Sequence, residues 1–195
     1  MAKKQHYRRK PRQNPVLPIA IGFFFIGLAI VMLASTKDKS SAGSGAPPGQ
    51  FSRAPLAVNF PAPDLALENL DGKTESLADY ETNVVLVNNW ATWCPPCKAE
   101  MPVLEAYYED HASKGFMIIA VEAGDSRDTV SEFAQNYGLQ FRIWLDPNGA
   151  SLKAFGNGNL PNSYISDRGG TVRYAWTGEL DRATLDKYVT PLITE

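Results

Sequence analysis

The chemistry of this chain centres on its only two cysteines, Cys94 and Cys97, which are separated by two prolines. The apolar, β-branched run 84–87 precedes them, and the helix-forming residues 98–101 follow. At a helix N-terminus, exposed N–H groups and the macrodipole stabilise a thiolate. We therefore predict a redox pair in which Cys94 is the exposed nucleophile of low pKa. Cys97 would then resolve the mixed disulfide that Cys94 forms with a substrate.

Two other interpretations of the cysteine pair remain open at this point. A structural zinc site takes about four ligands, but the only histidines, His6 and His111, lie far from the pair in sequence. A purely structural disulfide would close a very short loop and constrain the unfolded chain little. The redox interpretation is favoured over both, so we expect no metal and no cofactor beyond a Cys94–Cys97 disulfide.

The elements that would hold this pair form an alternating pattern. Strands are predicted at 65–67, 73–76, 84–90, 116–122, 141–145, 164–166 and 171–176, and helices at 77–80, 94–114, 127–137, 150–155 and 181–189. The strands at 65–76 and at 164–176 form hairpins around turn residues. Pro102 should kink the helix that begins at Cys94, and Gly115 should end it. The order predicts a three-layer α/β/α sandwich with a mixed sheet.

The charge of the chain is uneven. Residues 1–50 carry eight Lys or Arg and one acid, whereas residues 51–195 carry eleven Lys or Arg and twenty acids. These charges, +7 and −9, give the formal net charge of −2. The acidic part has no basic patch, so we expect no nucleic-acid partner.

The N-terminal part predicts a membrane anchor. Residues 16–34 are uncharged and almost wholly apolar, and about 20 such residues span a bilayer. We predict a basic cytoplasmic terminus (1–15), one transmembrane helix (16–36), a flexible Ser/Gly/Pro-rich linker (37–55) and an extracytoplasmic globular domain (56–195). A cleaved signal peptide is the alternative. The apolar run is longer than the about 7–15 residues of a signal core, so we favour the anchor.

The segment 89–102, N-W-A-T-W-C-P-P-C-K-A-E-M-P, resembles the active-site signature of thioredoxin-like proteins, most closely the membrane-anchored TlpA/ResA type. The resemblance covers about 56–189, including the N-terminal hairpin and a central helix–strand insertion at 127–145. It implies a thioredoxin-like fold and thiol–disulfide exchange outside the cytoplasm.

The resemblance also implies roles for residues around the cysteines. Pro161 matches the family's cis-proline loop, so Leu160 before it would contact the substrate chain and influence specificity. Trp93 would offer an apolar docking face beside the thiol. Pro95 and Pro96 would stiffen the loop between the sulfur atoms and line the same surface.

Glu100, one helical turn beyond Cys97, matches a glutamate that this type of protein places near its active site. It would tune the thiols or relay a proton, and the alternative is a solvated helix residue. Asn88 stands where thioredoxins have a buried aspartate, so Glu100 or water must act as general base. Asn89 replaces the usual Phe and leaves the packing beneath the site open. Glu122 either approaches the site or ends its strand in water.

These inferences predict a membrane-anchored, extracytoplasmic thiol–disulfide oxidoreductase that reduces protein disulfides. Its clients would be protein thiols and disulfides, and by analogy its electrons would come from a membrane thiol-transfer partner. Cytochrome c maturation is a common task of such proteins. One alternative is a peroxiredoxin-like thiol peroxidase, which the Pro-Pro-Cys after Cys94 disfavours. The other is a non-catalytic binding module with a structural disulfide.

Overall fold

The computed structural model describes residues 54–195. The predicted basic terminus, the predicted anchor at 16–36 and nearly all of the predicted linker lie outside this range. Within the described range, no helix combines the length and apolar character needed to cross a membrane.

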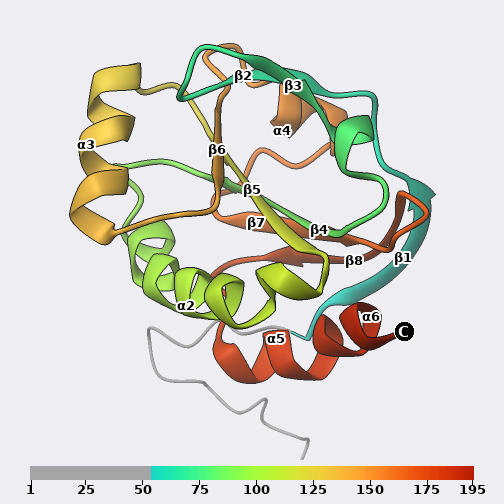
Figure 1. Ribbon diagram of the computed structural model, residues 1–195. Helices are drawn as coiled ribbons and strands as arrows, with labels where there is room; N and C mark the ends of the chain where they lie inside the picture. The colour runs from blue at the N-terminus through green and yellow to red at the C-terminus, as the bar shows by residue number, and fades with distance from the viewer. Residues whose placement is uncertain (1–53) are drawn as a thin grey trace, which may run out of the picture. The chain divides into compact units, whose positions relative to one another are not determined.

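An eight-stranded mixed sheet forms the centre of the domain (Figure 1). Its strands are β1 (Leu56–Pro61), β2 (Ala66–Asn69), β3 (Thr74–Ser76), β4 (Val84–Trp90), β5 (Phe116–Glu122), β6 (Arg142–Leu145), β7 (Asn162–Ser166) and β8 (Thr171–Thr177). Their order across the sheet is β1-β8-β7-β4-β5-β6-β2-β3. Strands β4, β5 and β6 are parallel, while the other neighbouring pairs are antiparallel. The central strand, β4, leads directly into the cysteine pair.

Helical segments cover both faces of the sheet. They are η1 (Leu77–Tyr80), α2 (Pro95–His111), η2 (Ala112–Lys114), α3 (Arg127–Tyr137), α4 (Ala150–Ala154), α5 (Arg182–Tyr188) and α6 (Thr190–Thr194). Figure 1 shows α2 and α5 on one side of the sheet and α4 on the other. The face opposite α2 is covered by shorter segments, η1 and α4 among them.

Strand alternation divides the core into two layers. Val84 and Leu86 of β4 pack with α2, α3 and α5, whereas Val85 and Val87 face the layer beneath η1 and α4. All seven residues of β4 are buried, because a parallel central strand is covered on both faces. This explains why β4 reads as a continuous apolar run up to its last three residues.

The predicted α/β order with a mixed sheet is confirmed. The strands at 84–90 and 116–122 and the helix at 127–137 have the predicted bounds. The helix predicted for 94–114 changes to a 3₁₀ turn after His111, and Gly115 ends that turn in the left-handed region with φ of 77°. Pro102 lies inside α2 without ending it.

Sequence reasoning missed β1 and α6. Strand β1 pairs antiparallel with β8 at one edge of the sheet, with Leu56 opposite Ala175. Its residues are almost all exposed, so it lacks the alternating pattern by which a half-buried strand is recognised. Helix α6 follows α5 directly and has Pro191 in its first turn.

Candidate active site

Cys94 and Cys97 form a disulfide at the N-terminus of α2, with their Cα atoms 5.3 Å apart. Cys94 is the N-cap residue of that helix, and its sulfur accepts a hydrogen bond from the Cys97 N–H at 3.4 Å. The predicted place of the pair at a helix start is confirmed. The predicted exposure of Cys94 is wrong for this oxidised state, since Cys94 is 4% exposed and Cys97 0%.

Three residues around the disulfide form an exposed surface. Trp93, directly before Cys94, is 65% exposed, although it is a large apolar side chain. Pro95 and Pro96 occupy the first turn of α2 and are also exposed. Helices tolerate proline there because the missing N–H has no intrahelical partner in any case. The structure therefore brings together the predicted docking residues at the disulfide, and their binding role stays a prediction.

The predicted cis-proline is confirmed, because the Leu160–Pro161 peptide bond is cis. Strand β7 begins immediately after Pro161, and its first residue, Asn162, lies opposite Asn89 in β4. The loop is therefore at the same end of the sheet as the disulfide. Leu160 is half-buried and packs against the core cluster that contains both cysteines. Within residues 54–195, neither its N–H nor its C=O makes a hydrogen bond.

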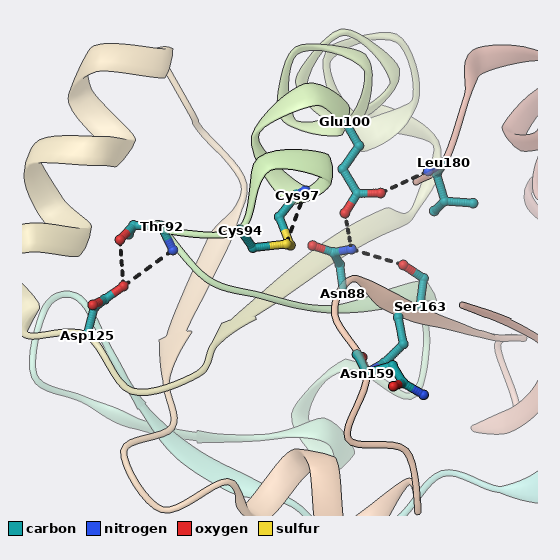
Figure 2. Close-up of a disulfide and its surroundings, with 10 residues drawn as sticks. Asn88, Thr92, Cys94, Cys97, Glu100, Asp125, Asn159, Ser163 and Leu180 are labelled. Carbon is teal, nitrogen blue, oxygen red and sulfur yellow. Dashed lines mark hydrogen bonds between the residues drawn. A yellow bond between two sulfur atoms is a disulfide. The ribbon is translucent and has the colours of Figure 1, made fainter. Parts of the chain in front are cut away.

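Glu100 is buried one turn beyond Cys97, so the solvated interpretation of this residue is wrong. Its Oε1 accepts a hydrogen bond from Asn88 Nδ2 at 2.9 Å, and its Oε2 accepts one from the Leu180 N–H at 2.9 Å (Figure 2). Burial raises the pKa of Glu100 to about 8, although both hydrogen bonds oppose that rise. A buried carboxyl group that titrates near neutrality is suited to proton transfer.

Asn88 links Glu100 to the cis-proline segment. Its Nδ2 also contacts Ser163 Oγ at 3.0 Å, two residues after Pro161. Figure 2 shows the amide oxygen of Asn88 on the side of the sulfur atoms. This oxygen is buried and has no hydrogen-bond partner within the described residues. No pattern in the sequence pointed directly to Ser163, whereas a polar residue at the end of an apolar strand was the signal for Asn88.

Asp125 lies on the other side of the disulfide from Glu100 (Figure 2), and a second carboxyl group, Glu122, is bonded to its backbone. Asp125 Oδ2 accepts hydrogen bonds from the Thr92 hydroxyl at 2.6 Å and from the Thr92 N–H at 3.3 Å. The Asp125 N–H donates to Glu122 Oε2 at 2.9 Å. Thr92 is two residues before Cys94, so this pair supports the loop that leads into the disulfide.

Glu122 is fully buried, so its interpretation as a strand-end carboxylate in water is wrong. Burial, followed by the contact with Asp125, raises the pKa of Glu122 to about 7. Burial acts on Asp125 as well, but the hydrogen bonds from Thr92 outweigh it and hold the Asp125 pKa below its ordinary value. Neutral Glu122 beside ionised Asp125 avoids two adjacent negative charges.

The arrangement can support dithiol–disulfide exchange. It combines a disulfide at a helix N-terminus, a carboxyl group able to take or give a proton near neutrality, and a backbone segment with unpaired N–H and C=O groups. Among residues 54–195, no group of three or more His, Cys, Asp or Glu side chains could bind a metal ion.

Comparisons with known proteins agree with this geometry. The model of the AhpC/TSA family matches residues 58–175. The thiol-disulfide oxidoreductase ResA of Geobacillus thermodenitrificans is 35% identical over 134 residues, which are 69% of this chain and 77% of that protein. ResA of Bacillus subtilis is 34% identical over 128 residues, which are 66% of this chain and 72% of that protein.

A solved structure shows the same fold. The thiol:disulfide interchange protein of the thioredoxin family from Chlorobium tepidum superposes with a TM-score of 0.63 at 26% identity. The match covers 71% of this chain and 99% of that protein. The thioredoxin-like fold predicted from the 89–102 segment is thus confirmed.

Proposed function

The chain belongs to the AhpC/TSA thioredoxin-like family and is a thiol–disulfide oxidoreductase, and we propose that it reduces disulfide bonds of client proteins through Cys94 and Cys97. The observation that carries this proposal is the buried Glu100 carboxyl, one helical turn beyond Cys97, with its pKa raised to about 8. A permanently oxidised structural disulfide has no use for such a group. A dithiol that gains and loses protons in each cycle, by contrast, needs a nearby group that can exchange them.

In the proposed reaction the Cys94 thiolate attacks one sulfur of a client disulfide. A bond forms between Cys94 and that client sulfur, and the other client sulfur leaves as a thiolate. The Cys97 thiol then loses its proton and attacks the Cys94 sulfur. This step forms the Cys94–Cys97 disulfide and releases the second client thiolate. Two electrons pass from the dithiol to the client, and the two departing thiolates take up protons.

Glu100 and Asn88 would serve the second step. Glu100 would receive the proton of Cys97, directly or through water, since its pKa lies near that of a thiol. Asn88 Oδ1 faces the sulfur atoms and has no hydrogen-bond partner among the described residues of the oxidised protein. It would accept a hydrogen bond from the Cys97 S–H in the reduced protein.

The cis-proline loop would bind the client. The unpaired N–H and C=O of Leu160 would pair with an extended client segment, as backbone groups pair at a sheet edge. Trp93 and Pro95 would supply apolar contact on either side of the reacting sulfur.

The domain would work on the extracytoplasmic side of a membrane, anchored by residues 16–36. A dithiol outside the cytoplasm needs an electron source, and the chemical class that fits is a second dithiol, carried by a membrane thiol-transfer partner. Supplying reduced cysteines for cytochrome c maturation is a task that fits a relative of ResA.

Membrane fractionation tests the proposed anchor. Intact protein should fractionate with membranes and leave its domain open to external protease. A soluble chain that begins near Ser35 would refute the anchor.

Trapping of mixed disulfides tests the proposed reduction. Full-length Cys97→Ser protein, expressed in its native membrane, should accumulate a covalent adduct with client proteins that dithiothreitol releases. Cys94→Ser is the matched control and should trap none. A reduction potential below about −300 mV, typical of structural disulfides, together with no adduct, would instead support the non-catalytic binding module. Rapid turnover of hydrogen peroxide would support the thiol peroxidase.

A further inference from the structure

Two buried asparagines face each other beneath the cis-proline loop. Asn89 in β4 and Asn162 in β7 are paired directly across the antiparallel strands, and both are almost completely inaccessible to solvent. Asn89 Nδ2 donates to Asn162 Oδ1 at 2.8 Å. Because strand residues alternate between faces, Asn89 points away from Glu100, to which its neighbour Asn88 is bonded. The pair is therefore separate from the Glu100 network.

The hydrogen bonds of this pair continue in both directions. Asn162 Nδ2 donates to the carbonyl oxygen of Asn159 at 2.6 Å, in the loop just before Leu160. At the other end, the Ser151 hydroxyl in α4 donates to Asn89 Oδ1 at 2.6 Å. Three consecutive hydrogen bonds thus run from α4 across two strands to the cis-proline loop.

The direction of this series is fixed at its loop end. A carbonyl oxygen only accepts, so the Asn162 amide must turn its NH₂ group towards Asn159. Its oxygen then faces Asn89, which must donate, and the oxygen of Asn89 in turn faces the Ser151 hydroxyl. Asn162 Nδ2 also donates to the Asn157 carbonyl at 3.4 Å, so two loop carbonyls orient every polar group in the series.

The backbone groups of Asn159 and Leu160 differ in whether they are hydrogen-bonded. The Asn159 carbonyl is bonded to Asn162, and the Asn159 N–H is bonded to Asn157 Oδ1 at 3.1 Å. The N–H and C=O of the next residue, Leu160, have no partner within the described residues. With Asn159 held inward, the backbone of Leu160, directly before Pro161, is available to another chain.

We propose that Asn89 and Asn162 are positioning residues, which hold the cis-proline loop so that the Leu160 backbone can pair with an extended client segment. An apolar pair of the same shape would fill the space, but it could neither donate to the Asn159 carbonyl nor accept from the buried Ser151 hydroxyl. The inference rests on the proposed reduction of protein disulfides. It identifies the residues that hold the loop in position for the client.

The test compares two substrates on the full-length reduced protein in detergent. One is a disulfide-containing peptide long enough to lie along the loop, and the other is 5,5′-dithiobis(2-nitrobenzoate), which has no peptide backbone. In the double variant Asn89→Leu/Asn162→Leu, the peptide concentration that gives half-maximal exchange should rise about fivefold, the factor that one ordinary hydrogen bond represents. The maximal rate with the peptide and the rate with the small disulfide should not change.

Two further variants keep the test decisive if the double variant folds poorly. In Asn162→Ser the side chain is too short to reach the Asn159 carbonyl. This variant should also raise the half-maximal peptide concentration and leave the rate with the small disulfide unchanged. Asn69→Leu is the matched control, because Asn69 is also buried and also holds a turn, but at the far edge of the sheet. It should leave the behaviour with the peptide unchanged.

The outcomes separate this inference from the proposed function. An unchanged half-maximal peptide concentration, or equal loss with both substrates, would overturn the positioning role of Asn89 and Asn162. A wild-type protein that reacts with the small disulfide but exchanges with no peptide or protein would refute the proposed function itself.

Discussion

Asn88 and Glu100 are joined by a buried hydrogen bond of 2.9 Å, which connects the strand before the disulfide to the helix after it. The amide of Asn88 also contacts Ser163, next to the cis-proline loop. One side chain therefore ties together the three segments that surround the sulfur atoms. In this position Glu100 is shielded from water, so its protonation is linked to the stability of the fold and, in the proposed reaction, to the chemistry of the thiols.

The first prediction concerns stability and Glu100. Its pKa is raised from 4.5 to about 8, so between these values the native protein keeps a proton that the unfolded chain has released. The free energy of unfolding should therefore fall on the order of a few kcal/mol as the pH rises through this window. The contribution of Glu100 to the free energy of unfolding is fully present below pH 4.5. Urea unfolding of Glu100→Gln across the window should show a flatter pH dependence. Glu109→Gln, an exposed position on the same helix, should keep the wild-type slope.

The second prediction concerns proton transfer by Glu100. Glu100→Gln removes the proposed general base. It should slow the attack of Cys97 on the mixed disulfide by about a hundredfold or less, since general acid–base catalysis contributes about 10²–10⁴-fold. A carboxylate also raises the pKa of a nearby thiol, so the thiol titrations of Glu100→Gln and wild type should diverge mainly above pH 8, where Glu100 is charged. Stopped-flow exchange and thiol titration measure both effects. Superimposable curves in both experiments would show that Glu100 takes no part.

The third prediction distinguishes the two thiols in the reduced protein. Cys94 at the helix N-cap should titrate below the free value of about 8.5 and alkylate first, although both cysteines are buried in the disulfide form. Iodoacetamide labelling followed by peptide mass mapping measures the two rates. Equal rates and similar pKa values would contradict the assignment of Cys94 as the nucleophile.

The fourth prediction concerns Glu122. Its pKa is raised from 4.5 to about 7, so its contribution to stability is fully present below pH 4.5 and is lost as the pH rises through 7. Glu122→Gln should remove this part of the pH dependence and leave the part that extends to pH 8. Unfolding of Glu122→Gln and Glu100→Gln, singly and together, separates the two contributions. A slope unchanged by Glu122→Gln would show that Glu122 is ionised in the native protein.

The fifth prediction concerns the exposed indole of Trp93. Because it is 65% exposed, Trp93→Ala should change the free energy of unfolding by only about 0.5 kcal/mol or less. Exchange with protein disulfides should slow, because the variant loses apolar contact beside Cys94. Leu56→Ala, at a side chain that is 68% exposed on the edge strand β1, is the matched control and should affect neither property. Equal exchange rates for both variants would argue against a docking role for Trp93.

Local sequence predicted much of the fold and the reacting pair. The run before Cys94 and the helix-forming residues after Cys97 specify a strand, a turn and a helix by short-range physics. Strand β1 escaped prediction because its stability comes from pairing with β8, which is more than 100 residues away in sequence. An edge strand with exposed side chains leaves no periodic trace.

The sequence by itself indicated the chemistry of this protein, because a cysteine pair at a helix start is specified by neighbouring residues, and the resemblance of segment 89–102 to a known family implied the role of Pro161. The tertiary structure alone decided the environment of that chemistry. Whether Glu100 and Glu122 lie in water or in the core depends on what packs over them, and Leu180 and Asp125 come from other parts of the chain. Desolvation is a property of the assembled fold, so the raised pKa values and the asparagine pair beneath the loop appear only when β4, β7 and α2 are packed together.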